Sequence, residues 1–477
     1  MTEESSYKGV WFLPENPDHQ VVGTLHYELN QHPYLDLTGI LVERSNKSHE
    51  PDFILGFTTD GKRITLYRSY ESERSHSMPG MQISQYKPLY ILKGAHFTLS
   101  EDFKFKVIKG RFRNLESWVG ISGFEQTETN NNNNETVVRY KRPEAINFSV
   151  CEGVTGSINF TYSYPFGRPL HKAKIEQHVE IHLEFMLSLP LLDVMEKLML
   201  FQNFLTLATF QIANPLSIVA VVEHQGESQV EDSNDPNFND DFGEDKKYTR
   251  CEVFYKPGFH IPLEKQSSRH NFLFSFKDVQ EDFQKIITQW VGLNDAIEPV
   301  LDLLLDSFYR EEGVTENKFL NVIHGLETFH RRRRKNEILP RDEHAKKISM
   351  IIDLVPEDTK SWLKEVLNFT NEPPLHHRLV ELMDEVWGSL LMQIIKDKDH
   401  FIRDTKNSRN YYTHYDPRGE KKALKGAELT YLTQRLRFIL IMLILKETGL
   451  EAATVERVVG RRVAFFRHLF NKDEFSG

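Results

Sequence analysis

The segment RNYYTHYDPRG, residues 409–419, places an arginine and a histidine with four residues between them, just ahead of a helix-stopping proline. Arg409 carries a permanent charge and His414 titrates near neutral pH, so together they could hold a phosphate and move a proton. Breaking an RNA backbone requires this chemistry. Asn410 could orient His414 or bind the phosphate. The alternative interpretation is a histidine that only caps a helix end.

The position of this pair on a helix constrains how it could work. Five helical steps place Arg409 and His414 about 140° apart around the helix axis. Both can serve one site only if the helix kinks or ends near Thr413, and Pro417 with Gly419 supplies such an ending. The segment is too polar for a bundle interior and lies between two strongly apolar segments. We therefore expect a polar helix end that lines a cleft or an interface.

Composition limits the protein classes that remain. The 477 residues are 39% hydrophobic, enough for two or three domains with apolar cores. The N-terminal residues show no secretion signal, and the longest apolar run, FILIMLILK from Phe438, is too short to span a bilayer. We expect a cytoplasmic protein without membrane contact. Two cysteines, Cys151 and Cys251, argue against disulfides and structural zinc, and the net charge of −10 argues against a general nucleic-acid coat.

Residues 1–272 are predicted to form a β-rich antiparallel domain. The segments LDLTGILVE, FILGFTTDGKRITLYRS and KAKIEQHVEIHLEF alternate apolar and polar residues or are dense in β-branched and aromatic residues, and Asp60-Gly61 is a turn signal. Residues 189–209 instead have helical spacing, which predicts an inserted helix. The polar runs 127–136 and 226–245 are predicted to be mobile loops.

From about Phe276 the apolar residues recur with a period of 3.6. Gly313, Pro373-Pro374 and Gly449 fit helix boundaries in this half. We therefore predict an α+β multidomain protein in which residues 273–477 form an all-α bundle.

Beyond these patterns, the run IRDTKNSRNYYTHYD resembles the Arg, Asn, spacer, His signature of HEPN domains, the helical ribonuclease bundles of prokaryotic defence and toxin systems. FLNVIHGLETFHRRR resembles an earlier HEPN helix with its acidic residue, here Glu327, and ELTYLTQRLRFILIMLILKETGL resembles the helix after the motif in the ApeA-like subgroup. The N-terminal half resembles that subgroup's β-rich domain in GTLHYELNQHPYLDLTGI, FILGFTTDGKRITLY and LESWVG.

The resemblance implies RNA cleavage without a metal or another cofactor. The ribose 2′-OH would attack the adjacent phosphorus and leave a 2′,3′-cyclic phosphate and a 5′-OH. His414 would exchange protons, Arg409 would neutralise charge on the phosphoryl oxygens, and Glu327 would hold one of these two residues in place. Asn410 completes the predicted catalytic set.

The resemblance also implies partners. One Arg/His pair lacks a second proton-transfer group, and the family resolves this by placing the motifs of two protomers face to face. The expected partners are therefore RNA, with tRNA among the candidate targets, and a second copy of the chain. The implied role is abortive anti-phage defence, with an N-terminal domain that senses a phage-derived trigger or regulates the bundle.

Further RNA contacts are predicted on both sides of the motif. Tyrosine rings can stack on bases, and arginines in the HRRRRK run can contact the RNA backbone. The same residues could instead be packed in the bundle or form a solvated helix end. These candidate RNA contacts are Tyr411, Tyr412, Arg331, Arg332, Arg333 and Arg334.

Two other chemistries match isolated fragments of the chain. Glu327 and His330 have the Glu, two residues, His spacing of di-iron bundles, but the only other such unit, Glu73 with His76, lies in the β-rich half, so no metal site is expected. Gly388-Ser389 with Asp397 and Asp399 imitates a nucleotidyltransferase pattern, but it sits inside a continuous helical stripe.

A third alternative has the same fold but no catalytic activity. A HEPN bundle without catalytic activity could serve for dimerisation or binding, with the N-terminal domain sensing a ligand or a phage component. The intact Arg409, Asn410 and His414 speak against this alternative without excluding it.

Overall fold

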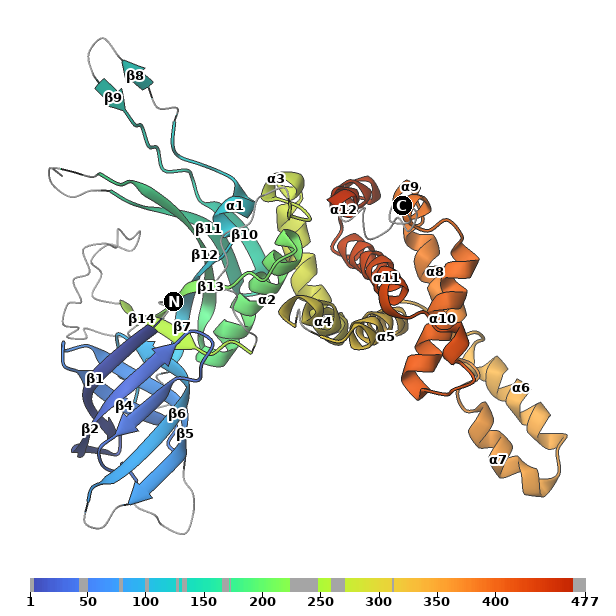
Figure 1. The fold of residues 1–477 in the computed structure, drawn as a ribbon, viewed down its shortest axis with the longest axis horizontal. Helices are drawn as coiled ribbons and strands as arrows, with labels where there is room; N and C mark the ends of the chain where they lie inside the picture. The colour runs from blue at the N-terminus through green and yellow to red at the C-terminus, as the bar shows by residue number, and fades with distance from the viewer. Residues whose placement is uncertain are drawn as a thin grey trace. The chain divides into compact units, whose positions relative to one another are not determined.

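The computed structural model describes residues 4–42, 50–76, 80–98, 103–125, 128–130, 135–164, 171, 173–223, 248–258, 271–310 and 313–465. The chain divides into two compact units, Met1–Gln280 and Glu281–Gly477 (Figure 1). The predicted fold class is confirmed, because the first unit is an antiparallel sheet and the second is helical.

Of the two predicted polar loops, residues 226–245 lie outside the described residues. The other, 127–136, is described in part and contributes to a small antiparallel pair of strands, β8 (Glu128–Asn130) and β9 (Glu135–Val137).

Six strands of the first unit form a closed antiparallel barrel. Their order around the barrel is β1 (Glu4–Leu13), β2 (Asn16–Glu28), β3 (Tyr34–Leu37), β6 (Gln82–Lys93), β5 (Arg63–His76) and β4 (Phe53–Thr58), and β4 pairs with β1 again. Apolar side chains such as Trp11, Leu25 and Ile64 fill the interior and are completely buried. The predicted turn between β4 and β5 uses Gly61, whose φ of 79° favours glycine.

The sheet continues beyond the barrel through β6. The strands that follow are β14 (Tyr248–Tyr255), β13 (Pro215–Glu223), β7 (Lys104–Phe112), β12 (Glu176–Pro190), β11 (Val154–Ser163) and β10 (Ile146–Cys151). Helix α2 (Leu191–Thr209) packs on β7 and β12. A Cβ on Gly110 would lie 3.0 Å from Leu198 Cδ1, so the glycine allows this close approach. Two short helices, α1 (Leu115–Val119) and α3 (Phe276–Val279), complete the unit.

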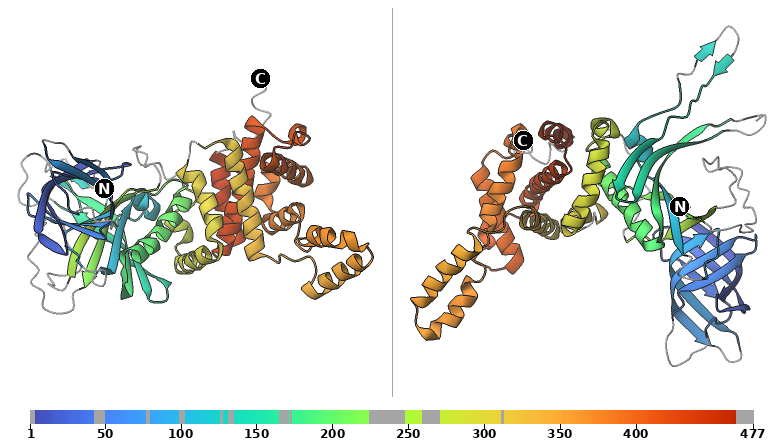
Figure 2. Two further views of the ribbon diagram at one scale, coloured as in Figure 1. Left: turned by 90° about the horizontal axis from the view of Figure 1, so that it is seen from below. Right: turned by 180° about the vertical axis from the view of Figure 1, so that it is seen from behind.

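Helix α11 (Gly426–Glu447) is the centre of the second unit, because every residue from Leu436 to Leu445 is buried. It packs with α4, α5, α8 and α12, and Figure 2 shows it among these helices. The other helices are α4 (Phe283–Tyr309), α5 (Thr315–Arg333), α6 (Arg341–Asp353), α7 (Glu357–Leu367), α8 (Leu375–Val386), α9 (Ser389–Ile394), α10 (Lys398–His414) and α12 (Ala452–Phe465), with a 3-10 turn at Glu420–Lys422. No helix in the described part of the chain is long and apolar enough to cross a membrane.

The continuous helical stripe predicted around Gly388 is wrong. α8 ends at Val386 and α9 begins at Ser389. The carboxylate of Glu456 on α12 holds this break, because it accepts hydrogen bonds from Leu390 N at 3.3 Å and Ser389 Oγ at 3.4 Å. Gly388 therefore joins two helices, whereas the nucleotidyltransferase pattern needs a strand before it.

Candidate functional site

Helix α10 carries the Arg/His motif at its C-terminal end. The helix begins at Lys398 and is capped by Asp397, whose side chain accepts a hydrogen bond from His400 N at 2.9 Å. It runs to His414, and Tyr415 then leaves the helix in the left-handed region with a φ of 49°. The expected helix end is therefore present, one residue beyond Thr413. Because α10 is helical at both positions, Arg409 and His414 lie about 140° apart around its axis.

Arg409 points toward α5, where it meets Glu327. Its Nε lies 3.1 Å from Glu327 Oε1 and its Nη2 lies 3.5 Å from Oε2. The two side chains are 26% and 22% exposed, so this pair is partly shielded from water but can still be reached by a ligand. The structure thus brings together two of the predicted site residues. It also shows which of the two candidates Glu327 contacts: Arg409.

His414 and Asn410 lie four residues apart on one face of α10, and both are exposed. Among the described residues, no hydrogen bond involves the His414 ring. Hydrogen bonds from Arg418 lower the pKa of Asp416 to about 2, and the nearby charge of His414 adds to this effect. A single chain therefore presents the proton-transfer group to solvent on a different face from Arg409.

The two tyrosines of the motif have different surroundings. Tyr412 is buried, its hydroxyl donates to Leu424 O at 2.8 Å, and burial raises its pKa. Tyr411 is half-buried, and the ammonium of Lys425 lies 5.7 Å from its ring centroid. Tyr415, 60% exposed, lies 5.5 Å from the Tyr411 ring between centroids. Tyr415 was not among the predicted RNA contacts, although it directly follows His414.

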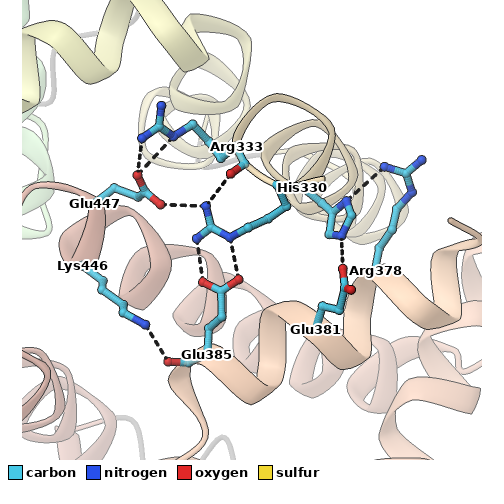
Figure 3. A network of polar contacts seen from close by, with 8 residues as sticks. His330, Arg333, Arg378, Glu381, Glu385, Lys446 and Glu447 are labelled. Atoms are coloured by element: carbon cyan, nitrogen blue, oxygen red, sulfur yellow. Dashed lines mark hydrogen bonds and ion pairs between the residues drawn. The ribbon is translucent and has the colours of Figure 1, made fainter. Parts of the chain in front are cut away.

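Ion pairs hold two arginines of the HRRRRK run, Arg333 and Arg334, within the helical unit, and Figure 3 shows this network. Arg334 binds both oxygens of Glu385, at 2.5 and 2.6 Å, and also reaches Glu447 at 2.8 Å. These bonds raise its pKa. Arg333 lies 2.6 Å from Glu447.

The two remaining arginines of the run are more exposed. Arg331 lies 2.8 Å from Glu372, whereas Arg332 donates to a backbone carbonyl, Ala296 O, at 3.2 Å. Three of the four arginines predicted to contact RNA thus bind acidic residues of the same unit. Of the four, only Arg332 has no carboxylate partner among the described residues.

A buried histidine lies beside these ion pairs. His330 is completely buried, its Nε2 lies 2.6 Å from Glu381 Oε2, and Arg378 Nη1 lies 3.3 Å from its Nδ1 (Figure 3). Burial lowers the pKa of His330. The hydrogen bond with His330 in turn lowers the pKa of Glu381. Glu327 and His330, which have the spacing of half a di-iron motif, are thus bonded to different partners.

In the part of the chain that the structure describes, no group of three or more His, Cys, Asp or Glu side chains could hold a metal ion.

Comparison with known families gives two matches. Residues 6–290 match the family described as ApeA N-terminal domain 1. Residues 320–454 match the family described as Apea-like HEPN. The second match contains Glu327 and the whole of α10. No curated protein and no solved structure is significantly similar to the chain.

Proposed function

Because the chain belongs to the ApeA family, and its HEPN domain places it among nuclease-type defence proteins, we propose that it is a metal-independent endoribonuclease whose active form is a dimer. The RNA would be host RNA, with tRNA among the candidate targets, and cleavage would act in anti-phage abortive infection. The N-terminal unit would sense the trigger or regulate the bundle.

The observation that carries this proposal is the division of the motif between two faces of α10. Arg409 is held by Glu327 at 3.1 Å on one face, whereas His414 and Asn410 are exposed on another. A motif that only capped a helix would not need a shielded cation on one face and an exposed imidazole on another. Two copies that place their α10 ends together would supply two histidines and two arginines to one phosphate.

The reaction needs one proton acceptor and one proton donor. A neutral His414 of one copy takes the proton of the ribose 2′-OH while that oxygen attacks the phosphorus. The bond from phosphorus to O5′ breaks, and a protonated His414 of the second copy gives its proton to the leaving oxygen. Arg409 binds the phosphoryl oxygens, where its planar guanidinium neutralises the charge that develops. The products are a 2′,3′-cyclic phosphate and a 5′-OH.

The test compares purified wild-type protein with His414→Ala and Arg409→Ala on total cellular RNA. Loss of a positioned proton-transfer group should lower the cleavage rate by about 10²- to 10⁴-fold. The matched controls are His400→Ala and Arg403→Ala, which remove the same residue types from exposed positions earlier on α10 and should leave the rate unchanged. Full activity in folded His414→Ala protein would refute the site.

The alternative is a HEPN bundle that only dimerises or binds. It predicts no cleavage by any of these variants or by the wild-type protein, while self-association and RNA binding persist.

A further inference from the structure

Helices α6 and α7 form a hairpin that extends beyond the other helices of its unit (Figures 1 and 2). The base of the hairpin is closed by Asn371. Its side chain accepts from Leu339 N at 2.9 Å and donates to Leu339 O at 3.0 Å. Its backbone carbonyl accepts from Ile338 N at 2.8 Å. The hairpin therefore has a defined root and is built as an arm.

This arm has almost no core of its own. Ile352 is the one buried residue of α6, and α7 has none. Helices of this length are marginal in water unless an apolar face is packed. The arm therefore lacks burial that a stable two-helix unit would need.

The apolar side chains of the arm instead face solvent in two stripes. On α6 and at its C-cap, Met350 is 68% exposed and Leu354 is 86% exposed, four residues apart on one face. On α7 and the turn after it, Trp362, Val366 and Phe369 are 61%, 54% and 70% exposed and follow helical spacing. Single exposed apolar residues are ordinary, but this concentration marks an interaction surface.

The charged residues beside the stripes indicate which kind of partner could cover these apolar side chains. Lys346 and Lys347 lie one turn before Met350 on α6, and both are exposed. Asp358 and Glu365 flank the stripe of α7, and both are exposed. The stripe of α6 thus has basic residues at its Met350 end and the exposed Asp353 next to Leu354, whereas the stripe of α7 has an acidic edge. In two copies of the arm related by a two-fold axis, the basic residues of each α6 can lie against the acidic residues of α7 in the other copy. The symmetry repeats this charge pairing, so it occurs twice.

The available area also suits a second copy. Large aromatic side chains bury about 150–250 Å² each, so the large apolar side chains of two arms could remove on the order of 1,200 Å² from water. This buried area is at the lower end of the range found for specific, stable protein–protein interfaces. A single arm against a polar surface would reach only part of it.

We propose that the α6–α7 arm docks on the arm of a second copy of this chain, with α6 of one copy against α7 of the other. The arms run tip to base, so that Lys347 of each copy lies near Asp358 of the other. Trp362 is the central anchor. This contact does not depend on RNA cleavage and is separate from the meeting of the two His414 motifs.

The first test measures self-association of the full chain by analytical ultracentrifugation. Trp362→Glu and Leu354→Glu should each raise the dissociation constant at least about 30-fold, as expected for buried anchor residues. The control is Met81→Glu, at a position 69% exposed in the first unit, which should leave the constant unchanged. Circular dichroism checks that each variant is folded. A wild-type chain that stays monomeric, or self-association unchanged in both arm variants, overturns the proposal.

The second test identifies the arrangement. Lys347→Glu and Asp358→Lys should each weaken self-association, because each places like charges together at both symmetric contacts. A mixture of the two variants should regain it, since both contacts then join opposite charges. No recovery on mixing would overturn the α6-on-α7 arrangement and would point to docking on the chain's own N-terminal unit or on another protein. Cleavage activity is not part of either readout, so the proposed ribonuclease can fail independently.

Discussion

The guanidinium of Arg409 lies against the carboxylate of Glu327, with Nε 3.1 Å from Oε1, although 82 positions separate the two residues in the chain. This pair joins α10 to α5 at the motif. It also fixes the cation about 140° around α10 from His414. The two chemical functions of the motif are therefore held apart within one chain, and the proposed site depends on a second copy to bring them together.

Removal of Glu327 should reduce catalysis through Arg409. In Glu327→Ala the guanidinium loses both contacts, and misplacement of a phosphate-binding group by about 1 Å can cost roughly 10²-fold in rate. The rate constant kcat should fall while KM for RNA stays close to the wild-type value. Single-turnover cleavage measures this, with Glu451→Gln as an exposed acidic control. A normal kcat would mean that Glu327 has only a structural role.

The ion pairs of α5 predict different effects of neighbouring arginines on stability. Arg334→Ala leaves Glu385 and Glu447 without their shared partner and should lower the free energy of unfolding by about 2 kcal/mol. Arg332→Ala removes one exposed contact with Ala296 O and should cost less than about 0.5 kcal/mol. Urea unfolding compares the two variants.

RNA binding by Arg332 can be separated from stability. If Arg332 contacts a phosphate, Arg332→Ala should lower the salt dependence of RNA affinity by about one counterion. An unchanged salt dependence of RNA affinity would mean that Arg332 does not bind a phosphate, and that all four arginines of the HRRRRK run have only structural roles.

Buried His330 should make the helical unit less stable in mild acid. Its pKa is lowered from 6.5 in the folded state, so the unfolded chain takes up a proton first as the pH falls. The unfolded state then binds more protons, and stability decreases with falling pH. Between about pH 7 and pH 5.5, the free energy of unfolding should fall more steeply for the wild-type protein than for His330→Gln. Equal slopes for the two proteins would contradict this assignment.

Mixed dimers test whether the site is shared. Wild-type chains combined with an excess of His414→Ala chains should lose activity more steeply than the wild-type fraction falls, since each site would need both histidines. A loss proportional to dilution would show that each chain cleaves alone.

The local patterns of the sequence predicted much of the fold. Alternation and Asp60-Gly61 predicted the β4–β5 hairpin, and helical spacing predicted the segments that became α4, α5, α10 and α11. Closure of the barrel could not be predicted in this way, because it needs β1 to pair with β4 and β3 to pair with β6 across long stretches of chain. Helix α6 was not singled out, because its exposed Met350 and Leu354 do not follow a core-facing pattern.

The candidate site was predictable to a similar extent. The spacing of Arg409 and His414 and the family resemblance identified α10, and α5 was identified by its acidic residue. The partners of the HRRRRK run were not predictable, because Glu385 and Glu447 lie 51 and 113 positions from Arg334 and no local pattern connects them. The break at Gly388 was missed because Glu456, which holds it, comes from another helix.

The most direct test of the central claim is the chemistry of the RNA ends produced by purified protein in excess EDTA. Wild-type protein should cleave and leave 2′,3′-cyclic phosphate and 5′-OH ends, His414→Ala should not, and a substrate with 2′-deoxyribose at the scissile position should resist. Cleavage that requires added Mg²⁺ or Mn²⁺, or products with 3′-OH and 5′-phosphate ends, would contradict the proposed mechanism.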